Sequence, residues 1–209
     1  MADNAIKKTG TNGFAGKTGG FLSKIYWRTI KFFKSIPYFL YNSWLTGFPS
    51  YTVRTFYLRH ILGIKIGKGT AIHTGCFFAG KKITIGRNTV IARNCYIDGR
   101  VGEVVIGNSV SIAPELYLLS LSHDKNDPDF KLIPGPVTIE DYAWIGARVM
   151  ILPGIHVKKG AVLGAGSVVT KSVEEFIVVG GNPAKQIGTR EKNVSYTLSF
   201  FPFFNTDIG

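Results

Sequence analysis

The chain has 209 residues, of which 45% are hydrophobic and 18% charged, with a formal net charge of +12 at pH 7. This length is ample for one domain with a real core, and the apolar content excludes wholesale disorder. Two cysteines are too few for a disulfide framework, which is typical of a reducing compartment, and no CxxC pair or Cys/His cluster predicts a structural metal. The 25 glycines lack a Gly-X-Y period, so they need another structural explanation.

The positive charge is concentrated at the start of the chain. Residues 1–65 contain ten Lys or Arg and one acidic residue, Asp3, whereas residues 66–209 contain fifteen basic and twelve acidic residues. A nucleic-acid-binding domain would carry its basic residues throughout its fold. This distribution therefore argues against nucleic acid as a partner.

The N-terminal third divides into two segments. Residues 1–20 are rich in Gly, Thr, Asn and Lys, and we expect a flexible basic tail without the apolar stretch of a secretory signal peptide. Residues 21–62 are expected to form an amphipathic, aromatic leader. Its polar residues recur at helical spacing and draw one stripe, which Pro37 should end: Lys24, Arg28, Lys31 and Ser35.

An uncharged stretch of 19 residues follows between Lys34 and Arg54. A membrane span needs ~20 apolar residues, but Pro37, Gly47 and Pro49 argue against a continuous one. The mixture of aromatic and basic residues suits a segment that lies on an anionic membrane surface. The alternative is that its apolar faces pack on the main domain or on a neighbouring subunit.

From Gly63 onward the sequence has a period of six residues. One position of that period is always apolar: Ile66, Ile72, Phe78, Ile85, Ile91, Ile97, Ile106, Ile112, Leu118, Ile139, Ile145, Ile151, Val157, Leu163 and Val169. So short a unit suits a short strand and a tight corner, and three units make one triangular coil of a β-solenoid. Glycines at the corners explain the glycine excess. The period predicts an all-β domain over residues 63–189 with about five coils, followed by a C-terminal extension over residues 190–209.

Insertions interrupt the period only after the third anchor of a coil, at Phe78, Ile97 and Leu118, so all of them should protrude from the same corner. The largest covers residues 119–134, and a structureless excursion of that length is usually functional. Cys76 and Cys95 occupy equivalent positions on adjacent coils, away from this loop. Buried packing is therefore expected for both, rather than a disulfide or a nucleophile.

These features resemble the hexapeptide-repeat O-acetyltransferase family. The resemblance rests on the Ile-Gly hexapeptides, the loop SHDKNDPDF (122–130), the run WIGARVMILPGIHVKKGAVLGAGSVVTKSV (144–173) and the closing GGNPAKQIG (180–188), and it covers about residues 54–190. The nearest branch acetylates bacterial exopolysaccharides, including colanic acid, with galactoside and maltose acetyltransferases as cousins. The resemblance implies a left-handed parallel β-helix, against the usual crossover hand, and a homotrimer with acetyl-CoA in the groove between subunits.

One histidine stands out as a candidate catalytic residue. Of His60, His73, His123 and His156, only His123 lies in the long insertion. Acetyl transfer from a thioester to a sugar hydroxyl needs a base near neutral pH, and the unperturbed histidine pKa of ~6.5 suits that task. The family's loop histidine has this role and maps onto His123. Asp124 is a candidate to orient the imidazole, or else a loop acid that contacts solvent.

The resemblance also implies a coenzyme site. Small residues would lie against the pantetheine arm and basic groups near the phosphates, and the matching positions are Ala147, Ala165, Thr170, Lys171 and Lys185. The two alanines are 18 residues, or one coil, apart, so they should stack into a flat wall. Alternatively, the alanines only satisfy coil corners and the lysines are ordinary solvated charges.

The acceptor site transfers less well. The galactoside branch has an asparagine near the acceptor where this chain has Ala92, although Asn94 lies two positions later. Asn94 and Trp144 are therefore the acceptor-site candidates. Trp144 is equally consistent with packing or a subunit contact.

Taken together, these features predict an acetyl-CoA-dependent O-acetyltransferase that modifies a sugar hydroxyl by direct transfer, in bacterial surface polysaccharide or glycolipid biosynthesis. The expected partners are a sugar or lipid-linked saccharide, further copies of the chain, and an anionic membrane at the cytoplasmic face of the inner membrane. An amino-sugar or antibiotic acceptor, and a non-catalytic trimer, are the alternatives. A γ-type carbonic anhydrase would need three clustered histidines, whereas His73 and His123 lie two coils apart, so no metal is expected.

Overall fold

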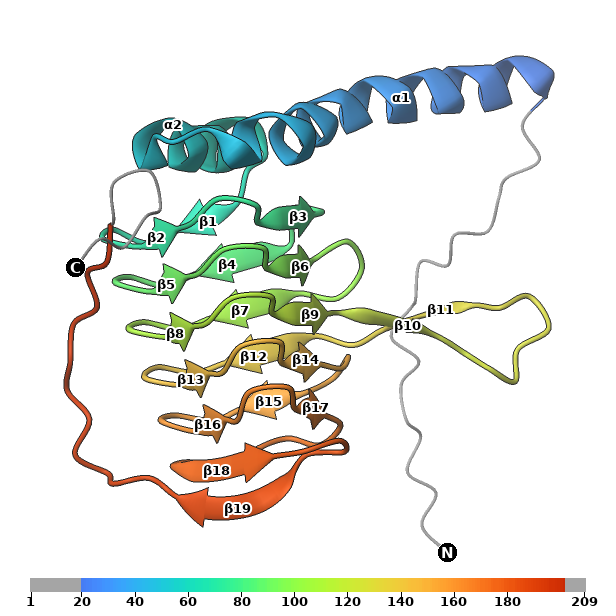
Figure 1. Cartoon of the computed structure of the whole chain (residues 1–209). Helices are drawn as coiled ribbons and strands as arrows, with labels where there is room; N and C mark the ends of the chain where they lie inside the picture. The colour runs from blue at the N-terminus through green and yellow to red at the C-terminus, as the bar shows by residue number, and fades with distance from the viewer. Residues whose placement is uncertain (1–19, 202–209) are drawn as a thin grey trace, which may run out of the picture. The chain divides into compact units, whose positions relative to one another are not determined.

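The computed structural model describes residues 20–201, so the expected tail over residues 1–20 lies outside the described residues except for Gly20. The chain divides into two compact units, residues 1–36 and 37–209. The second unit is a stack of short strands (Figure 1). The β-solenoid predicted from the six-residue period is therefore confirmed.

Three parallel sheets form the sides of the solenoid, and each turn of the chain contributes one strand to each sheet. The first contains β1 (Lys65–Ile66), β4 (Ile83–Ile85), β7 (Val104–Ile106), β12 (Val137–Ile139) and β15 (His156–Val157). The second contains β2 (Ala71–Ile72), β5 (Val90–Ile91), β8 (Ser111–Ile112), β13 (Trp144–Ile145), β16 (Val162–Leu163), β18 (Ile177–Gly180) and the antiparallel β19 (Lys185–Thr189). The third contains β3 (Phe77–Ala79), β6 (Tyr96–Asp98), β9 (Tyr117–Leu119), β14 (Met150–Ile151) and β17 (Val168–Val169).

The predicted anchors fill the interior. All of them are buried except Ile66, which is only partly buried because it lies in the first turn. Identical or similar residues stack in register, for example Ile85 on Ile106 and Ile145 on Leu163. Because each strand is only two to five residues long, this interior stack is the main source of hydrophobic stabilisation.

The solenoid is longer than the five coils predicted. Val173 forms a parallel bridge with Val157, and β18 pairs with β16, so about a sixth turn follows Val169. The hexapeptide pattern weakens here, at Glu174 and Glu175, because β18 is closed by the antiparallel β19 rather than by another corner.

Helices precede the solenoid: α1 (Phe21–Ser43), the 3₁₀ turn η1 (Leu45–Gly47), α2 (Tyr51–Phe56) and the π-helical η2 (Tyr57–Ile61). The prediction that Pro37 ends the first helix is wrong, because α1 continues for six residues beyond it. Tertiary contacts compensate for the missing backbone donor: Tyr41 is fully buried, and the Asn42 side chain exchanges two hydrogen bonds of 3.0 Å with the backbone of Phe78. Among the described residues, no helix is both long and apolar enough to cross a membrane.

The C-terminal extension follows the solenoid back toward its first turn (Figure 1). Arg190 and Tyr196 both donate hydrogen bonds to the carbonyl of Tyr142, at 2.9 and 3.1 Å. Further along, the ring of Phe200 stacks on His73, with centroids 5.5 Å apart. These contacts hold the extension against the domain from the fourth turn to the first.

Candidate functional site

The long insertion is an ordered β-hairpin rather than a structureless loop. Its strands are β10 (Leu121–His123) and β11 (Leu132–Pro134), which pair antiparallel with His123 opposite Leu132. It projects from the end of β9, and the shorter insertions follow β3 and β6 in the same sheet (Figure 1). The prediction that all insertions leave one corner is therefore confirmed.

Two glycines let the hairpin leave the solenoid closely packed. A Cβ on Gly135 would lie 2.3 Å from the Cβ of Pro153 and 2.7 Å from the nitrogen of Gly154. A Cβ on Gly102 would lie 2.4 Å from the carbonyl oxygen of Ser120. The base of the hairpin thus fits against backbone that cannot move aside, which sets the direction in which the hairpin projects.

His123 is held by Phe130 from the far side of the hairpin turn. Its Nδ1 lies 2.7 Å from the Phe130 carbonyl oxygen, and the two rings stack with centroids 3.9 Å apart and planes 14° apart. A carbonyl can only accept, so Nδ1 carries the proton and Nε2 of the neutral imidazole is left with its lone pair. The side chain is therefore oriented with a basic nitrogen directed away from its support.

Asp124 is not the partner of His123 in this arrangement. Its carboxylate accepts a hydrogen bond of 2.9 Å from the nitrogen of Asn126, and its own nitrogen donates to the Lys131 carbonyl. Asp124 therefore shapes the hairpin turn. Although His123 and Asp124 are adjacent in sequence, their side chains lie in different environments. The group that orients the imidazole is the Phe130 carbonyl.

Sequence reasoning missed Phe130, although a signal was present. The segment KNDPD is rich in turn-forming residues and is flanked by Leu119 and Leu121 on one side and Leu132 and Ile133 on the other. That pattern is typical of a hairpin. Pairing the two arms would have brought the residues that follow the turn close to His123.

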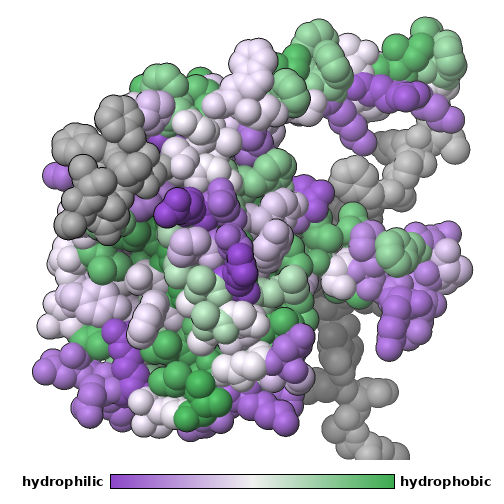
Figure 2. All heavy atoms as spheres, viewed as in Figure 1, coloured by the Kyte–Doolittle hydropathy of each residue, from purple (hydrophilic) through white to green (hydrophobic). Residues whose placement is uncertain are grey.

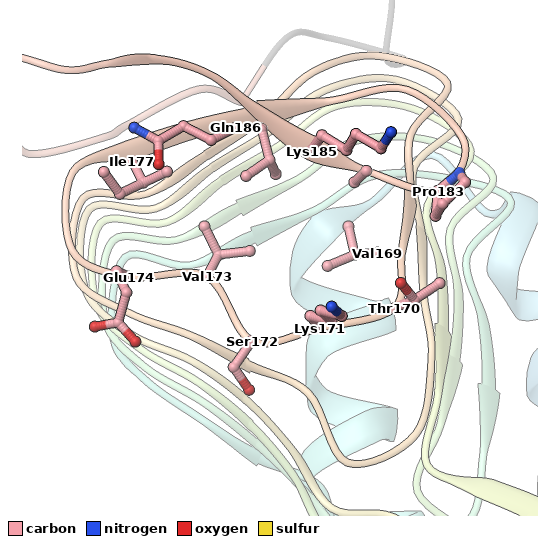
Figure 3. A pocket seen from close by; sticks show the side chains of 12 residues that line it. Val169, Thr170, Lys171, Ser172, Val173, Glu174, Ile177, Pro183, Lys185 and Gln186 are labelled. Carbon is pink, nitrogen blue, oxygen red and sulfur yellow. The ribbon is translucent and has the colours of Figure 1, made fainter.

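Three of the five predicted coenzyme residues lie together at the last turn. Thr170, Lys171 and Lys185 line one pocket of about 400 Å³, with the lysines coming from the segment after β17 and from the start of β19 (Figure 3). Both lysines are exposed, and the pocket's carboxylate, Glu174, is paired with Lys158 outside it. The pocket therefore presents uncompensated positive charge, which fits a phosphate-bearing ligand.

The two alanines lie elsewhere, on the corner between the second and third sheets. Ala147 and Ala165 occupy adjacent turns, and the carbonyl of Ala147 accepts a hydrogen bond of 2.8 Å from the nitrogen of Gly166. A Cβ on Gly146 would lie 2.6 Å from the nitrogen of Ala165. The expected stacking is present, and the backbones of the two turns pack closely at this corner. Neither alanine lines the pocket at the last turn.

The acceptor candidates are not brought together. Asn94 lies at a corner of the second turn with φ of 61°, and its side-chain oxygen sits where Gly75 would need a Cβ. Trp144 lies on β13 in the fourth turn and is half exposed. Asn94 thus has a backbone role at its corner, and the exposed Trp144 is the one of the two with surface available to a ligand.

The cysteines are buried and unbridged, as predicted. The Cys95 thiol lies 3.1 Å from the Ala92 carbonyl and the Cys76 thiol lies 3.2 Å from the same oxygen. The hydrogen bond that the Cys76 thiol donates to Cys95, together with burial, raises the pKa of the Cys76 thiol. Within the part of the chain that the structure describes, no cluster of three or more His, Cys, Asp or Glu side chains could hold a metal ion.

Comparison with known proteins places this chain in a family. The family model for bacterial transferase hexapeptide repeats matches residues 136–171. A putative colanic acid biosynthesis acetyltransferase of Escherichia coli is 34% identical over 67% of this chain and 76% of its own. The chain belongs to the hexapeptide-repeat acetyltransferases.

Other relatives extend the comparison. A chloramphenicol acetyltransferase of Klebsiella aerogenes is 50% identical over 48% of this chain and 51% of its own. A hexapeptide-repeat acetyltransferase of Vibrio cholerae, solved with acetyl coenzyme A, superposes with a TM-score of 0.66 at 25% identity, covering 83% of this chain and 93% of the other. The chain spans only 57% of the length of a probable acetyltransferase of Mycobacterium tuberculosis and 55% of a putative one of Schizosaccharomyces pombe.

Proposed function

We propose that the protein transfers an acetyl group from acetyl-CoA directly to a saccharide hydroxyl, with His123 as the general base. The observation that carries this proposal is the hydrogen bond from Nδ1 of His123 to the Phe130 carbonyl, because it leaves Nε2 as the free base. Acetyl-CoA supplies an activated thioester. Nε2 accepts the acceptor's hydroxyl proton as its oxygen attacks, and the imidazolium then returns that proton to the leaving sulfur.

The donor is proposed to bind along the corner that carries Ala147 and Ala165, with its phosphates toward Thr170, Lys171 and Lys185. The stacked alanines, with their closely packed backbones, and the positive pocket support this assignment. His123 does not line that pocket. A homotrimer, in which one subunit's hairpin reaches the donor groove of the next, would bring the base and the donor together.

A saccharide acceptor is supported by the colanic acid and galactoside acetyltransferases among the relatives. Trp144 is proposed to contribute to the acceptor pocket, whereas Asn94, two turns away, is proposed to shape only its own corner. Acceptors attached to a lipid carrier, and a location at the cytoplasmic face of a bacterial inner membrane, would agree with the basic stripe of α1, in which Lys24 and Arg28 are exposed.

An antibiotic acceptor is the second candidate. It is favoured by the 50% identity to the Klebsiella chloramphenicol acetyltransferase, which is the highest among the relatives described above. That match covers about half of each chain, so chloramphenicol is tested as an acceptor beside the saccharides.

The decisive experiment measures release of free CoA thiol from acetyl-CoA with a panel of galactosides, glucosides, amino sugars and chloramphenicol. We expect turnover with a saccharide and transfer to oxygen, seen by mass spectrometry as an alkali-labile acetyl group. O-acetyl content of cell-surface glycans with and without the protein gives the corresponding test in cells. Turnover with chloramphenicol alone would replace the saccharide proposal, and no thiol release with any acceptor would overturn the activity.

A further inference from the structure

The first turn of the solenoid is covered by an end cap, defined here as residues 37–61. The cap has a buried side and an exposed side. Tyr41, Arg54 and Leu58 are fully buried, and Arg54 donates hydrogen bonds to the carbonyls of Phe48 and Ile72. Residues half a helical turn away from these face outward, away from the solenoid.

The exposed side of the end cap is apolar and aromatic. Trp44 is 72% exposed and Phe39 and Phe56 are each 59% exposed, with Phe48, Val53 and Ile61 also exposed. In Figure 2, green and pale side chains alternate with purple ones along the helices above the first turn. Isolated apolar residues on a surface are ordinary. Six exposed apolar residues among the 25 residues of the end cap are typical of an interaction surface.

The first two turns, directly behind the cap, form a basic collar. Residues 65–100 contain seven basic side chains, all exposed: Lys65, Lys68, Lys81, Lys82, Arg87, Arg93 and Arg100. Their only acidic residue, Asp98, is buried and paired with Arg100 at 2.7 Å. Residues 101–189 contain seven basic and nine acidic side chains. The positive charge therefore continues past the leader and stops after the second turn.

The collar surrounds the solenoid rather than marking one face. Lys68 lies at the corner between β1 and β2, Arg93 between β5 and β6, and Lys81 between β3 and β4, so each of the three corners carries at least one cation. Parallel strands are about 4.8 Å apart, so the two turns begin directly behind the end cap and differ in depth by only one strand spacing. When the cap is immersed in the interfacial region, both turns lie within roughly one to two Debye lengths, of ~8 Å each, of the headgroups. The acidic turns lie farther away and are screened.

We propose that the solenoid docks end-on on an anionic lipid bilayer, with the end cap in the interfacial region and the basic collar over the headgroups. The apolar end cap matches the apolar interior of a bilayer, and the cations on all three corners match its anionic headgroups. Nucleic acid offers the same phosphates but no apolar phase for Trp44 and Phe56. This surface is distinct from the α1 stripe, and its test does not depend on acetyl transfer.

End-on docking also keeps the hairpin clear of the lipid. The hairpin leaves β9, which is third from the capped end in its sheet, about two strand spacings beyond the first turn. His123 would then lie roughly 10 Å above the first turn, at a height that a saccharide on a membrane carrier can reach. This consequence rests on the proposed function, whereas the docking itself does not.

Three matched charge reversals in the full chain test the collar. Each replaces three exposed cations by Glu: Lys68, Lys81 and Arg93 in the collar; Lys24, Arg28 and Lys34 in α1; and Lys125, Lys159 and Lys192 as the control. Sedimentation with vesicles of phosphatidylglycerol and phosphatidylcholine should weaken at least tenfold for the collar variant and change less than about twofold for the control. Equal losses in collar and control, or wild-type binding by the collar variant, would overturn the proposal.

The three tryptophans give a test of orientation that leaves the collar intact. Trp27 lies in α1, Trp44 in the end cap and Trp144 in the fourth turn, and all are exposed. In single-tryptophan variants made by Trp→Phe, brominated phosphatidylcholine mixed with phosphatidylglycerol should quench Trp44 and leave Trp144 unchanged. Quenching of Trp144 as strong as that of Trp44 would indicate side-on binding, and an unquenched Trp44 would show that the cap does not meet the lipid. Either result contradicts end-on docking.

Discussion

Nδ1 of His123 donates a 2.7 Å hydrogen bond to the carbonyl oxygen of Phe130, and the Phe130 ring covers the imidazole at 3.9 Å. The β10–β11 pairing places His123 opposite Leu132 and so brings Phe130, two residues before Leu132, beside the imidazole. The hairpin therefore sets both the tautomer and the plane of the imidazole.

His123→Ala should reduce kcat for acetyl transfer by about 10²–10⁴-fold, because the acceptor hydroxyl loses its base. The melting temperature should not change, since the side chain lies on a projecting hairpin. His60→Ala, which removes an exposed histidine far from the hairpin, is the control. Activity of the His123 variant within tenfold of wild type would exclude the general-base role.

Phe130→Ala keeps the accepting carbonyl but removes the stacked ring. A ring pair contributes about 0.5–1.5 kcal/mol, so we expect a loss of roughly two- to tenfold in kcat with little change in KM for acetyl-CoA. Phe77→Ala, which removes another exposed stacked ring, should leave kcat unchanged. If the Phe130 variant is as active as wild type, the hydrogen bond alone orients the imidazole.

Charge reversal in the pocket at the last turn should weaken the binding of acetyl-CoA. Lys171→Glu and Lys185→Glu place a negative charge beside the proposed phosphates, and each should raise KM for acetyl-CoA more than KM for the acceptor. The effect should shrink with added salt because these side chains are exposed. Lys192→Glu, in the C-terminal extension, is the matched control. Unchanged coenzyme constants in both variants would make the lysines ordinary surface charges.

Gly135→Ala should displace the hairpin, because its Cβ would meet Pro153 at 2.3 Å and the backbone of Gly154 at 2.7 Å. Overpacking of this kind costs about 1–3 kcal/mol. Thermal unfolding should therefore show a lower melting temperature, and kcat should fall with it. Gly47→Ala, where nothing lies within 4 Å of the added Cβ, should do neither.

Stability should fall as the pH drops below about 6.5, the usual histidine value, because of His73. Burial lowers the pKa of His73, the nearby Arg54 and Arg93 add to that effect, and the Phe200 carbonyl opposes it. With a folded-state pKa below the unfolded one, the unfolded chain binds the proton first, so stability is retained above pH 6.5 and lost progressively below it. His73→Phe keeps an aromatic ring against Phe200 and should remove this step from the pH dependence of the melting temperature.

The six-residue period was enough to predict the solenoid. Each strand and its corner take up six residues of backbone, so the inward-facing apolar residue recurs every six positions. That period is visible in the sequence without any knowledge of tertiary contacts. It identified the buried anchors from Ile72 to Val169, the corner from which the insertions leave, and the position of His123 in the largest of them. The family resemblance rested on the same local motifs.

Other features depend on contacts between residues distant in the chain, so no local pattern in the sequence predicted them. Helix α1 passes through Pro37 because Asn42 bonds Phe78, 36 residues later. Phe130 supports His123 because β10 pairs with β11. Lys68, Lys81 and Arg93 are scattered in sequence, yet the coiling of the chain gathers them around one end of the solenoid. Periodicity indicates how each short segment folds. The energy of long-range packing depends on which distant segments come into contact, and the local pattern does not encode those contacts.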